Sequence, residues 1–171
     1  MPAALLAANI QALVRSMANV EANPVDLASK INQHLCRHTP DDRFATAVLV
    51  ALDRDSGELT YVNAGHNPPV LVCKGSVTFL GTTGVPLGLF ADAKFEAGKT
   101  VIHAGDSLVI YTDGLTDSIA AENPNDRLRE VLAGKSGTTM SSLKSLVDPK
   151  YNEDDVTILL VKRIAPPGTL A

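Results

Sequence analysis

The chain has 171 residues, of which 45% are hydrophobic and 20% charged, and its formal net charge is −4. This composition is sufficient for one soluble globular domain with a substantial core, and it offers no basic surface that would select nucleic acid or anionic lipid. No apolar run reaches the roughly 18 to 20 residues of a membrane span, and the first residues lack the order of a signal peptide. Cys36 and Cys73 have no metal or redox spacing, which indicates reduced thiols. We therefore expect a cytoplasmic protein with no nucleic-acid or membrane partner.

Two helices are predicted at the beginning of the chain. Apolar residues recur at three- and four-residue steps over residues 3–20, which is the spacing of one buried helix face. Asn23 has the side chain of an N-cap and Pro24 fits the first helical position, so a second helix is expected over 24–38.

After residue 43 the pattern changes to that of strands. "FATAVLVAL" and "ELTYVNAG" flank the turn sequence "DRDSG" and predict a hairpin whose two strands both lie in the interior of a sheet. Later segments predict a pair of strands around Lys74-Gly75, two more around Ala104-Gly105-Asp106 and a last one in "DDVTILLVKR", six or seven antiparallel strands in all. Short helices are expected at 125–134 and 141–147, and a loose end at 164–171. This order predicts an α+β fold in which helices cover antiparallel sheets.

Three aspartates flank two of the predicted strands. Asp113 ends the run "SLVIYTDG", where Gly114 permits a turn, while Asp154 and Asp155 come directly before the last strand. If these strands are antiparallel neighbours, the carboxylates meet at one edge of the sheet. Like charges gathered there would repel, and a hard cation such as Mg²⁺ or Mn²⁺ would relieve the repulsion. The sequence alone leaves the alternative of turn, cap and solvated aspartates open.

Five ordered blocks carry a resemblance to a known family: "AALLAANIQALVR", "FATAVLVALDRDSGELTYVNAGHNPPVLV", "GVPLGLF", "AGDSLVIYTDGLTD" and "DDVTILLVKR". In this order they resemble the SpoIIE-type branch of the metal-dependent PPM (PP2C-like) serine/threonine phosphatases. The resemblance implies a sandwich of two antiparallel sheets flanked by helix pairs over residues 1–163. It also implies that Asp113 and Asp154 bind a pair of Mn²⁺ or Mg²⁺ ions, with Asp155 and the backbone of Gly114 as weaker candidates.

The resemblance breaks at the beginning of the chain. In the family, "AALL" follows an Asp-x-Ser-Gly-Lys/His-Gly segment whose aspartate bridges both ions, whereas here Ala3-Ala4 directly follow Met1-Pro2. We therefore expect an N-terminally truncated domain that holds one ion or none and is weak or inactive as a phosphatase. We also expect the missing strands to expose a sheet edge that pairs in a homodimer.

The function that the resemblance implies is hydrolysis of phosphoserine or phosphothreonine by a metal-activated water. The implied substrate is a small anti-sigma-factor antagonist protein of a bacterial signalling system. His66, in a loop made rigid by Pro68 and Pro69, is a candidate metal ligand or general acid, and the alternative is that it stabilises the loop through hydrogen bonds to backbone groups. A non-catalytic interaction module with the same fold is the alternative function.

Overall fold

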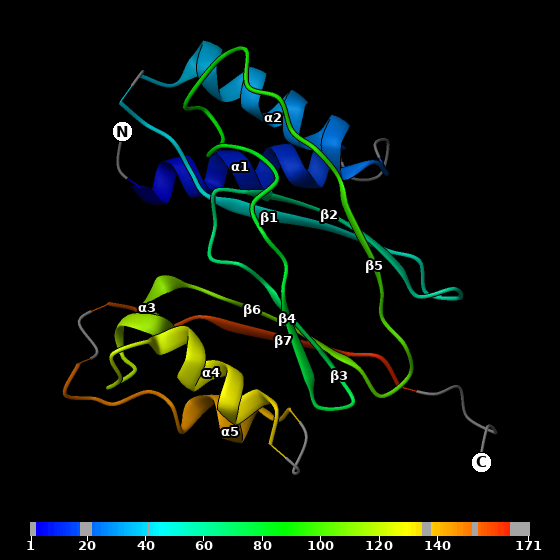
Figure 1. Ribbon diagram of the computed structural model, residues 1–171. Helices are drawn as coiled ribbons and strands as arrows, with labels where there is room; N and C mark the ends of the chain where they lie inside the picture. The colour runs from blue at the N-terminus through cyan, green and yellow to red at the C-terminus, as the bar shows by residue number, and fades with distance from the viewer. Residues whose placement is uncertain (1–2, 18–21, 41, 135–137, 152–153, 165–171) are drawn as a thin grey trace. The chain divides into compact units, whose positions relative to one another are not determined.

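The computed structural model describes residues 3–17, 22–40, 42–134, 138–151 and 154–164 (Figure 1). The chain divides into two compact units. The first unit comprises Met1–His66 and Thr82–Val101, and the second comprises Asn67–Gly81 and Ile102–Ala171. Each unit contains one antiparallel sheet and its own helices, which confirms the α+β class.

The first unit is a three-stranded sheet with a pair of helices. Its strands have the order β1-β2-β5, and each neighbouring pair is antiparallel. The elements are α1 (Ala3–Met17), α2 (Pro24–His38), β1 (Ala47–Leu52), β2 (Glu58–Ala64) and β5 (Gly98–Val101). Both predicted helices are confirmed, and residues 18–20 of the first prediction lie outside the described part of the chain.

Helix α2 begins where the sequence predicts. The side chain of Asn23 accepts a hydrogen bond from the backbone N–H of Val25 at 3.0 Å, which satisfies one of the donors that a helix start leaves unpaired. Leu27, Ile31 and Leu35 lie on one face of the helix and are buried in the core of this unit. The predicted stripe is therefore the face that α2 packs against the sheet.

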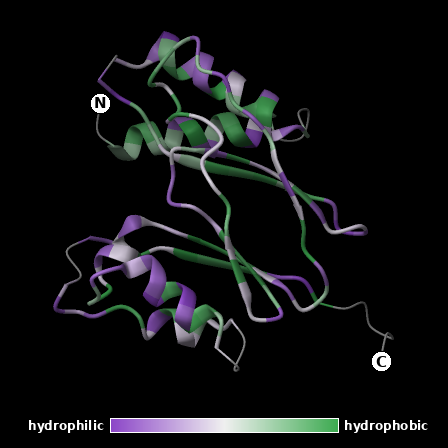
Figure 2. Cartoon of the chain, in the orientation of Figure 1, coloured by the Kyte–Doolittle hydropathy of each residue, from purple (hydrophilic) through white to green (hydrophobic). Residues whose placement is uncertain are grey.

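The second unit is a four-stranded sheet covered by short helices. Its strands have the order β4-β3-β6-β7, again with antiparallel neighbours. The elements are β3 (Val70–Cys73), β4 (Ser76–Phe79), β6 (Ser107–Tyr111), α3 (Asp113–Asp117), α4 (Pro124–Leu132), α5 (Met140–Lys144) and β7 (Ile158–Lys162). Leu115, Leu128 and Leu143, one from each helix, are fully buried in one core with Val109 and Tyr111 of β6. In Figure 2 the hydrophobic stretches of these helices and strands stand out in green.

The hairpin around Lys74-Gly75 is confirmed. Lys74 and Gly75 have φ values of +46° and +83°, so both central residues adopt the left-handed region that a tight two-residue hairpin turn requires. Lysine pays a steric cost there that glycine does not.

The pairing of two other segments differs from the sequence prediction. Strand β1 was expected inside a sheet, but among the described residues it pairs with β2 alone, and its side chains are half-buried or exposed. Strands β5 and β6 flank the turn around Gly105 as predicted, yet they belong to different sheets and different units. An apolar run indicates burial but does not identify the neighbouring strand, which explains both differences.

A close approach joins β2 and β5. Tyr61 and Gly98 are paired across the two strands, and a Cβ atom added at Gly98 would overlap the phenol ring of Tyr61. Tyr61 is itself 9% exposed, and burial raises its pKa. The ring therefore occupies the space that a side chain at position 98 would need.

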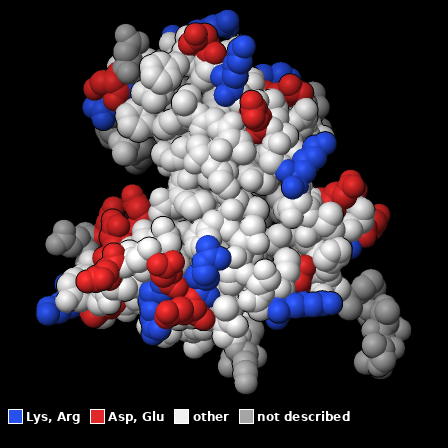
Figure 3. Space-filling model, in the orientation of Figure 1, with Lys and Arg blue, Asp and Glu red and all other residues white. Residues whose placement is uncertain are grey.

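Surface features agree with the low net charge. On the face shown in Figure 3, acidic and basic side chains are interspersed. Within the residues that the structure describes, no helix is both long and apolar enough to cross a membrane.

Candidate metal centre

The end of the β6–β7 ladder brings the predicted acidic residues to one edge. Tyr111 pairs with Ile158 in the last position of the ladder, and the N–H of Thr112 then donates to the carbonyl of Thr157 at 3.1 Å. Asp113 follows directly on one strand, and Asp154 and Asp155 precede the other. The prediction that these strands are antiparallel neighbours is confirmed, and we call the three aspartates the acidic edge.

Gly114 lies against the backbone of the acidic edge. A Cβ atom at this position would be 2.5 Å from the carbonyl oxygen of Asp155 and 3.4 Å from that of Asp154, closer than real side chains allow in the first case. Asp113 and Gly114 form the first turn of α3 rather than the predicted loop. Glycine is therefore required here for close packing and not for an unusual turn.

The carboxylates of the acidic edge are exposed and only lightly engaged. Oδ1 of Asp113 accepts the N–H of Gly114 at 3.0 Å, and Oδ1 of Asp154 accepts the N–H of Asp155 at 2.7 Å. The carbonyl of Gly114 accepts the N–H of Ser118 at 3.2 Å. Both backbone groups of Gly114 thus have partners, so the carboxylates are the better donors for an ion.

The donor set of the acidic edge fits a hard cation in its chemistry. Carboxylate oxygens are the ligands that Mg²⁺ and Mn²⁺ prefer. Among the described residues, however, no three His, Cys, Asp or Glu side chains are grouped so that they could hold a metal ion. The arrangement therefore suits one loosely held ion rather than a closed cage.

An apolar groove begins one residue after Asp155. It has a volume of about 450 Å³ and is lined by Met140, Lys144, Val147, Val156 and Ile158. The groove lies between α5 and β7, and none of the three aspartates lines it.

His66 belongs to the first unit and has its own partners there. Its backbone N–H donates to Oδ1 of Asn63 at 2.8 Å, and its Nδ1 lies 3.1 Å from Oγ1 of Thr46. The ring is half-buried. These contacts are those expected of a loop-stabilising residue, and the catalytic role of His66 remains a prediction.

Asn63 organises the loop that carries His66, a role that the sequence did not reveal. Its side chain is fully buried, and its backbone oxygen accepts the N–H groups of Thr83 and Gly84 at 2.9 and 3.1 Å. Its own N–H donates to Oγ1 of Thr83 at 3.0 Å. Nδ2 of Asn63 has no hydrogen-bond partner among the described residues. The signal available in the sequence was an asparagine inside the alternating strand "ELTYVNAG", two residues before Gly65.

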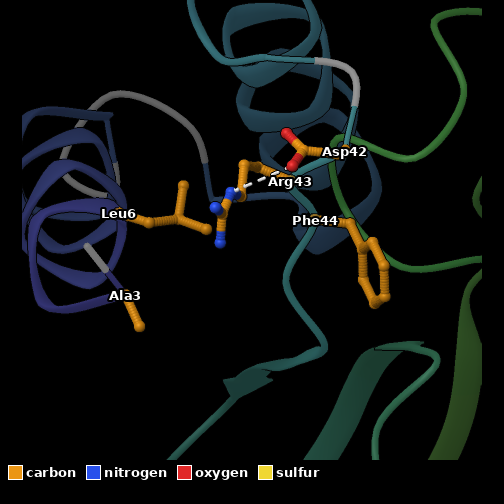
Figure 4. Close-up of a pocket in the computed structure, with 5 residues that line it drawn as sticks. All are labelled: Ala3, Leu6, Asp42, Arg43 and Phe44. Atoms are coloured by element: carbon orange, nitrogen blue, oxygen red, sulfur yellow. Dashed lines mark ion pairs between the residues drawn. The ribbon is translucent and has the colours of Figure 1, made fainter. Parts of the chain in front are cut away.

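A smaller cavity in the first unit carries no comparable chemistry. It measures about 250 Å³ and is lined by Ala3, Leu6, Asp42, Arg43 and Phe44 (Figure 4). Figure 4 shows Leu6 and Arg43 extending toward one another, with Arg43 paired to Asp42 at 3.5 Å. Because the pair is neutral overall, the cavity offers little net charge to an anionic ligand.

Comparison with solved structures defines the class. The fold is that of the PP2C-type phosphatase domains. The crystal structure of the RsbU and RsbW domains of Rv1364c from Mycobacterium tuberculosis matches with a TM-score of 0.81 and 28% identity, over 96% of this chain and 49% of that one. The phosphatase domain of SpoIIE from Bacillus subtilis, from a manganese-presoaked crystal, matches with a TM-score of 0.66 and 19% identity, over 92% and 73% of the two chains.

Sequence comparison defines the family. The family model described as Stage II sporulation protein E (SpoIIE) matches residues 1–164, and the chain belongs to this family. The phosphoserine phosphatase RsbP of Bacillus subtilis (strain 168) is 27% identical over 168 residues, which are 92% of this chain and 41% of RsbP. The chain thus spans less than half the length of this relative. The predicted resemblance is confirmed.

Proposed function

We propose that this chain is a protein serine/threonine phosphatase domain that removes phosphate from a small phosphorylated regulatory protein. Membership of the SpoIIE family and the similarity to the phosphoserine phosphatase RsbP support the reaction. The observation that carries the proposal is the β6–β7 pairing, which brings Asp113 to the same edge as Asp154 and Asp155.

In this proposal Asp113 and Asp154 hold a divalent cation, Mn²⁺ or Mg²⁺, and Asp155 is a weaker ligand. A bound ion would supply neutralisation of the phosphate oxygens and activation of a water molecule for attack on phosphorus. The chain's own contribution is to present exposed carboxylates at one end of the β6–β7 ladder, with Gly114 packed against the backbone of Asp155. Because the described residues bring fewer than three ligating side chains together, we expect weak binding of one ion and weak activity.

The neighbouring groove supports a protein substrate. Met140, Val147, Val156 and Ile158 offer apolar contact area, and Lys144 adds one positive charge. When the phosphorylated side chain of the substrate lies at the acidic edge, the substrate residues on either side of it would lie in this groove. We propose a small anti-sigma-factor antagonist as the substrate class, which is the class that the resemblance to the SpoIIE family implies.

The test is dephosphorylation of a phosphoserine-containing antagonist protein in the presence of Mn²⁺. We expect Asp113→Asn and Asp154→Asn to lower the rate by about 100-fold, because each removes one ligand charge. Asp117→Asn is the matched control, since Asp117 is an exposed aspartate at the other end of α3. Equal rates in all three variants and the wild type would contradict the ligand assignment.

A non-catalytic interaction module is the second candidate function. The absence of a three-ligand group among the described residues favours it, because a closed metal site is what catalysis needs most. Binding of the phosphorylated antagonist that is unaffected by Mn²⁺ and by Asp113→Asn, together with no release of phosphate, would support the module over the enzyme.

We also propose a cytoplasmic homodimer that forms through an open sheet edge. The free thiols Cys36 and Cys73 agree with a reducing compartment. Strands β1 and β7 each end a sheet in the described part of the chain and expose Val50 (38%) and Leu159 (54%). Light scattering after size exclusion checks this, and a monomer that persists at high concentration would rule it out.

A further inference from the structure

We infer that Thr112 is a positioning residue that fixes the two halves of the acidic edge relative to one another through its hydroxyl group. The inference rests on the proposed function, because the position it assigns to Thr112 is beside the proposed metal ligands.

The hydroxyl of Thr112 both accepts and donates a hydrogen bond. Oγ1 accepts the backbone N–H of Thr157 at 3.0 Å and donates to the carbonyl oxygen of Asp155 at 3.3 Å. The N–H of Thr112 donates to the carbonyl of Thr157 at 3.1 Å. One residue on the β6 side thus holds three backbone groups of the segment that leads from Asp155 into β7.

These bonds stand where the ladder itself has ended. Tyr111 and Ile158 form the last strand pair, and beyond it the backbone bond from the N–H of Thr112 to the carbonyl of Thr157 is the one that the described residues add. The hydroxyl supplies the acceptor for the N–H of Thr157 in place of a backbone carbonyl, and it also holds the carbonyl of Asp155. Without it, the segment that carries Asp154 and Asp155 would be tied to Asp113 by the one backbone bond between Thr112 and Thr157 and by the packing of Gly114.

The anchoring by Thr112 opposes the electrostatic repulsion between the carboxylates of the acidic edge. Before an ion binds, three negative charges share one edge and repel, which favours movement of the segments away from each other. An anchor that keeps them together lowers the cost of assembling the site when the ion arrives. Thr112 is half-buried and the two bonds of its hydroxyl are exposed, so removal of the hydroxyl should affect ion binding more than folding.

The test is calorimetric titration of the full chain with Mn²⁺. Thr112→Val keeps the shape of the side chain and removes the hydroxyl, and it should weaken Mn²⁺ binding about 10-fold. Thr112→Ser keeps the hydroxyl and should restore binding to within about 2-fold of the wild type. Thr78→Val is the matched control, because Thr78 is exposed on β4 at the opposite edge of the same sheet.

A second measurement does not depend on the ion. Hydrogen exchange of the Thr157 amide, the donor to Oγ1 of Thr112, should become about 10-fold faster in Thr112→Val and stay unchanged in Thr78→Val. If the valine variant does not fold, both measurements are made on Thr112→Ala instead. This variant removes the hydroxyl without placing a methyl group near Asp155.

The outcomes separate this inference from the proposed function. If Asp113→Asn loses Mn²⁺ while Thr112→Val binds it like the wild type, Thr112 has no positioning role and the metal site stands. If the wild type takes up no Mn²⁺, the proposed metal site fails, and exchange of the Thr157 amide alone then decides whether Thr112 anchors the segment. Unchanged exchange of the Thr157 amide in Thr112→Val would show that the hydroxyl does not anchor the segment.

Discussion

The His66 loop and the acidic edge are both built at the end of a strand, but they are built in opposite ways. In the His66 loop, defined by residues 63–67, a fully buried Asn63 binds the backbone of Thr83, Gly84 and His66. At the acidic edge, the carboxylates are exposed and each accepts only a neighbouring backbone N–H. The first arrangement fixes a loop, whereas the second leaves charged oxygens accessible to a ligand.

This difference distinguishes the residues that stabilise the fold from the residues that are available to bind a ligand. Buried side chains that bond to the backbone contribute to folding, as Asn63 does through Oδ1, although its Nδ2 has no partner among the described residues. Exposed carboxylates with unused acceptor capacity are available for binding. Variants in the His66 loop should therefore change stability, and variants at the acidic edge should change ion binding with little effect on stability.

The largest effect is expected for Asn63→Ala. The substitution removes the acceptor of the His66 N–H and leaves a cavity, and it should lower the free energy of unfolding by about 2 kcal/mol. Urea denaturation measures this. Thr83→Val, which removes only the acceptor of the Asn63 N–H, should cost about 1 kcal/mol. A loss under about 0.5 kcal/mol for Asn63→Ala would show that the loop does not depend on the buried asparagine.

The next effect concerns pH and a thiol in the second unit. Burial, followed by a hydrogen bond to Asp106, raises the pKa of Cys73 from 9.0 to about 11. The folded state therefore favours the neutral thiol, and this contribution to stability is fully present below about pH 9 and lost as the pH rises to about 11.

Alkylation checks the raised pKa of Cys73. At pH 8 the folded protein should react at Cys73 roughly 10-fold more slowly than the unfolded chain. The raised pKa makes each thiolate more nucleophilic, but the much smaller fraction of ionised thiol in the folded state has the larger effect. Cys36→Ala isolates the signal of Cys73. Equal rates in the folded and unfolded states would contradict the shift.

A smaller effect is expected for His66→Ala. The ring is half-buried and its Nδ1 is paired with Thr46, so the loss of stability should be about 1 kcal/mol, and Thr46→Val should lose a similar amount. A 100-fold loss of phosphatase activity at unchanged stability would instead favour the general-acid role. The His66 loop would then contribute to catalysis, contrary to the distinction drawn between the two regions.

The smallest effect is expected for Asp113→Asn without added metal. Removing one of several clustered negative charges from an exposed edge should leave the free energy of unfolding within about 0.5 kcal/mol of the wild type, on the more stable side. Thermal denaturation with a chelator present measures this. A large destabilisation would show that Asp113 is a structural residue.

Much of the fold could be predicted because local signals and tertiary packing agree. Asn23 and Pro24 place the beginning of α2, and Lys74-Gly75 places a hairpin, since each depends on a few neighbouring residues. The assignment of β5 and β6 to different sheets could not be predicted, because the pattern of apolar residues in a strand does not name its partner.

The candidate site divides in the same way. Asp113, Asp154 and Asp155 could be found because they flank strands whose antiparallel pairing places them together. The roles of Thr112 and Gly114 depend on contacts with residues more than forty positions away, so the sequence pointed to a turn where the structure has a helix and a close backbone contact. The metal ligation itself stays a prediction.

The contact between Tyr61 and Gly98 has a consequence for how this protein can vary. A larger residue at position 98 collides with the ring, while a smaller residue at position 61 leaves an empty space over the glycine. Each change alone should therefore lower stability, and the two changes together should compensate one another. Mutational libraries and evolutionary drift should therefore change the two positions as a pair, which gives β2 and β5 a signature of covariation.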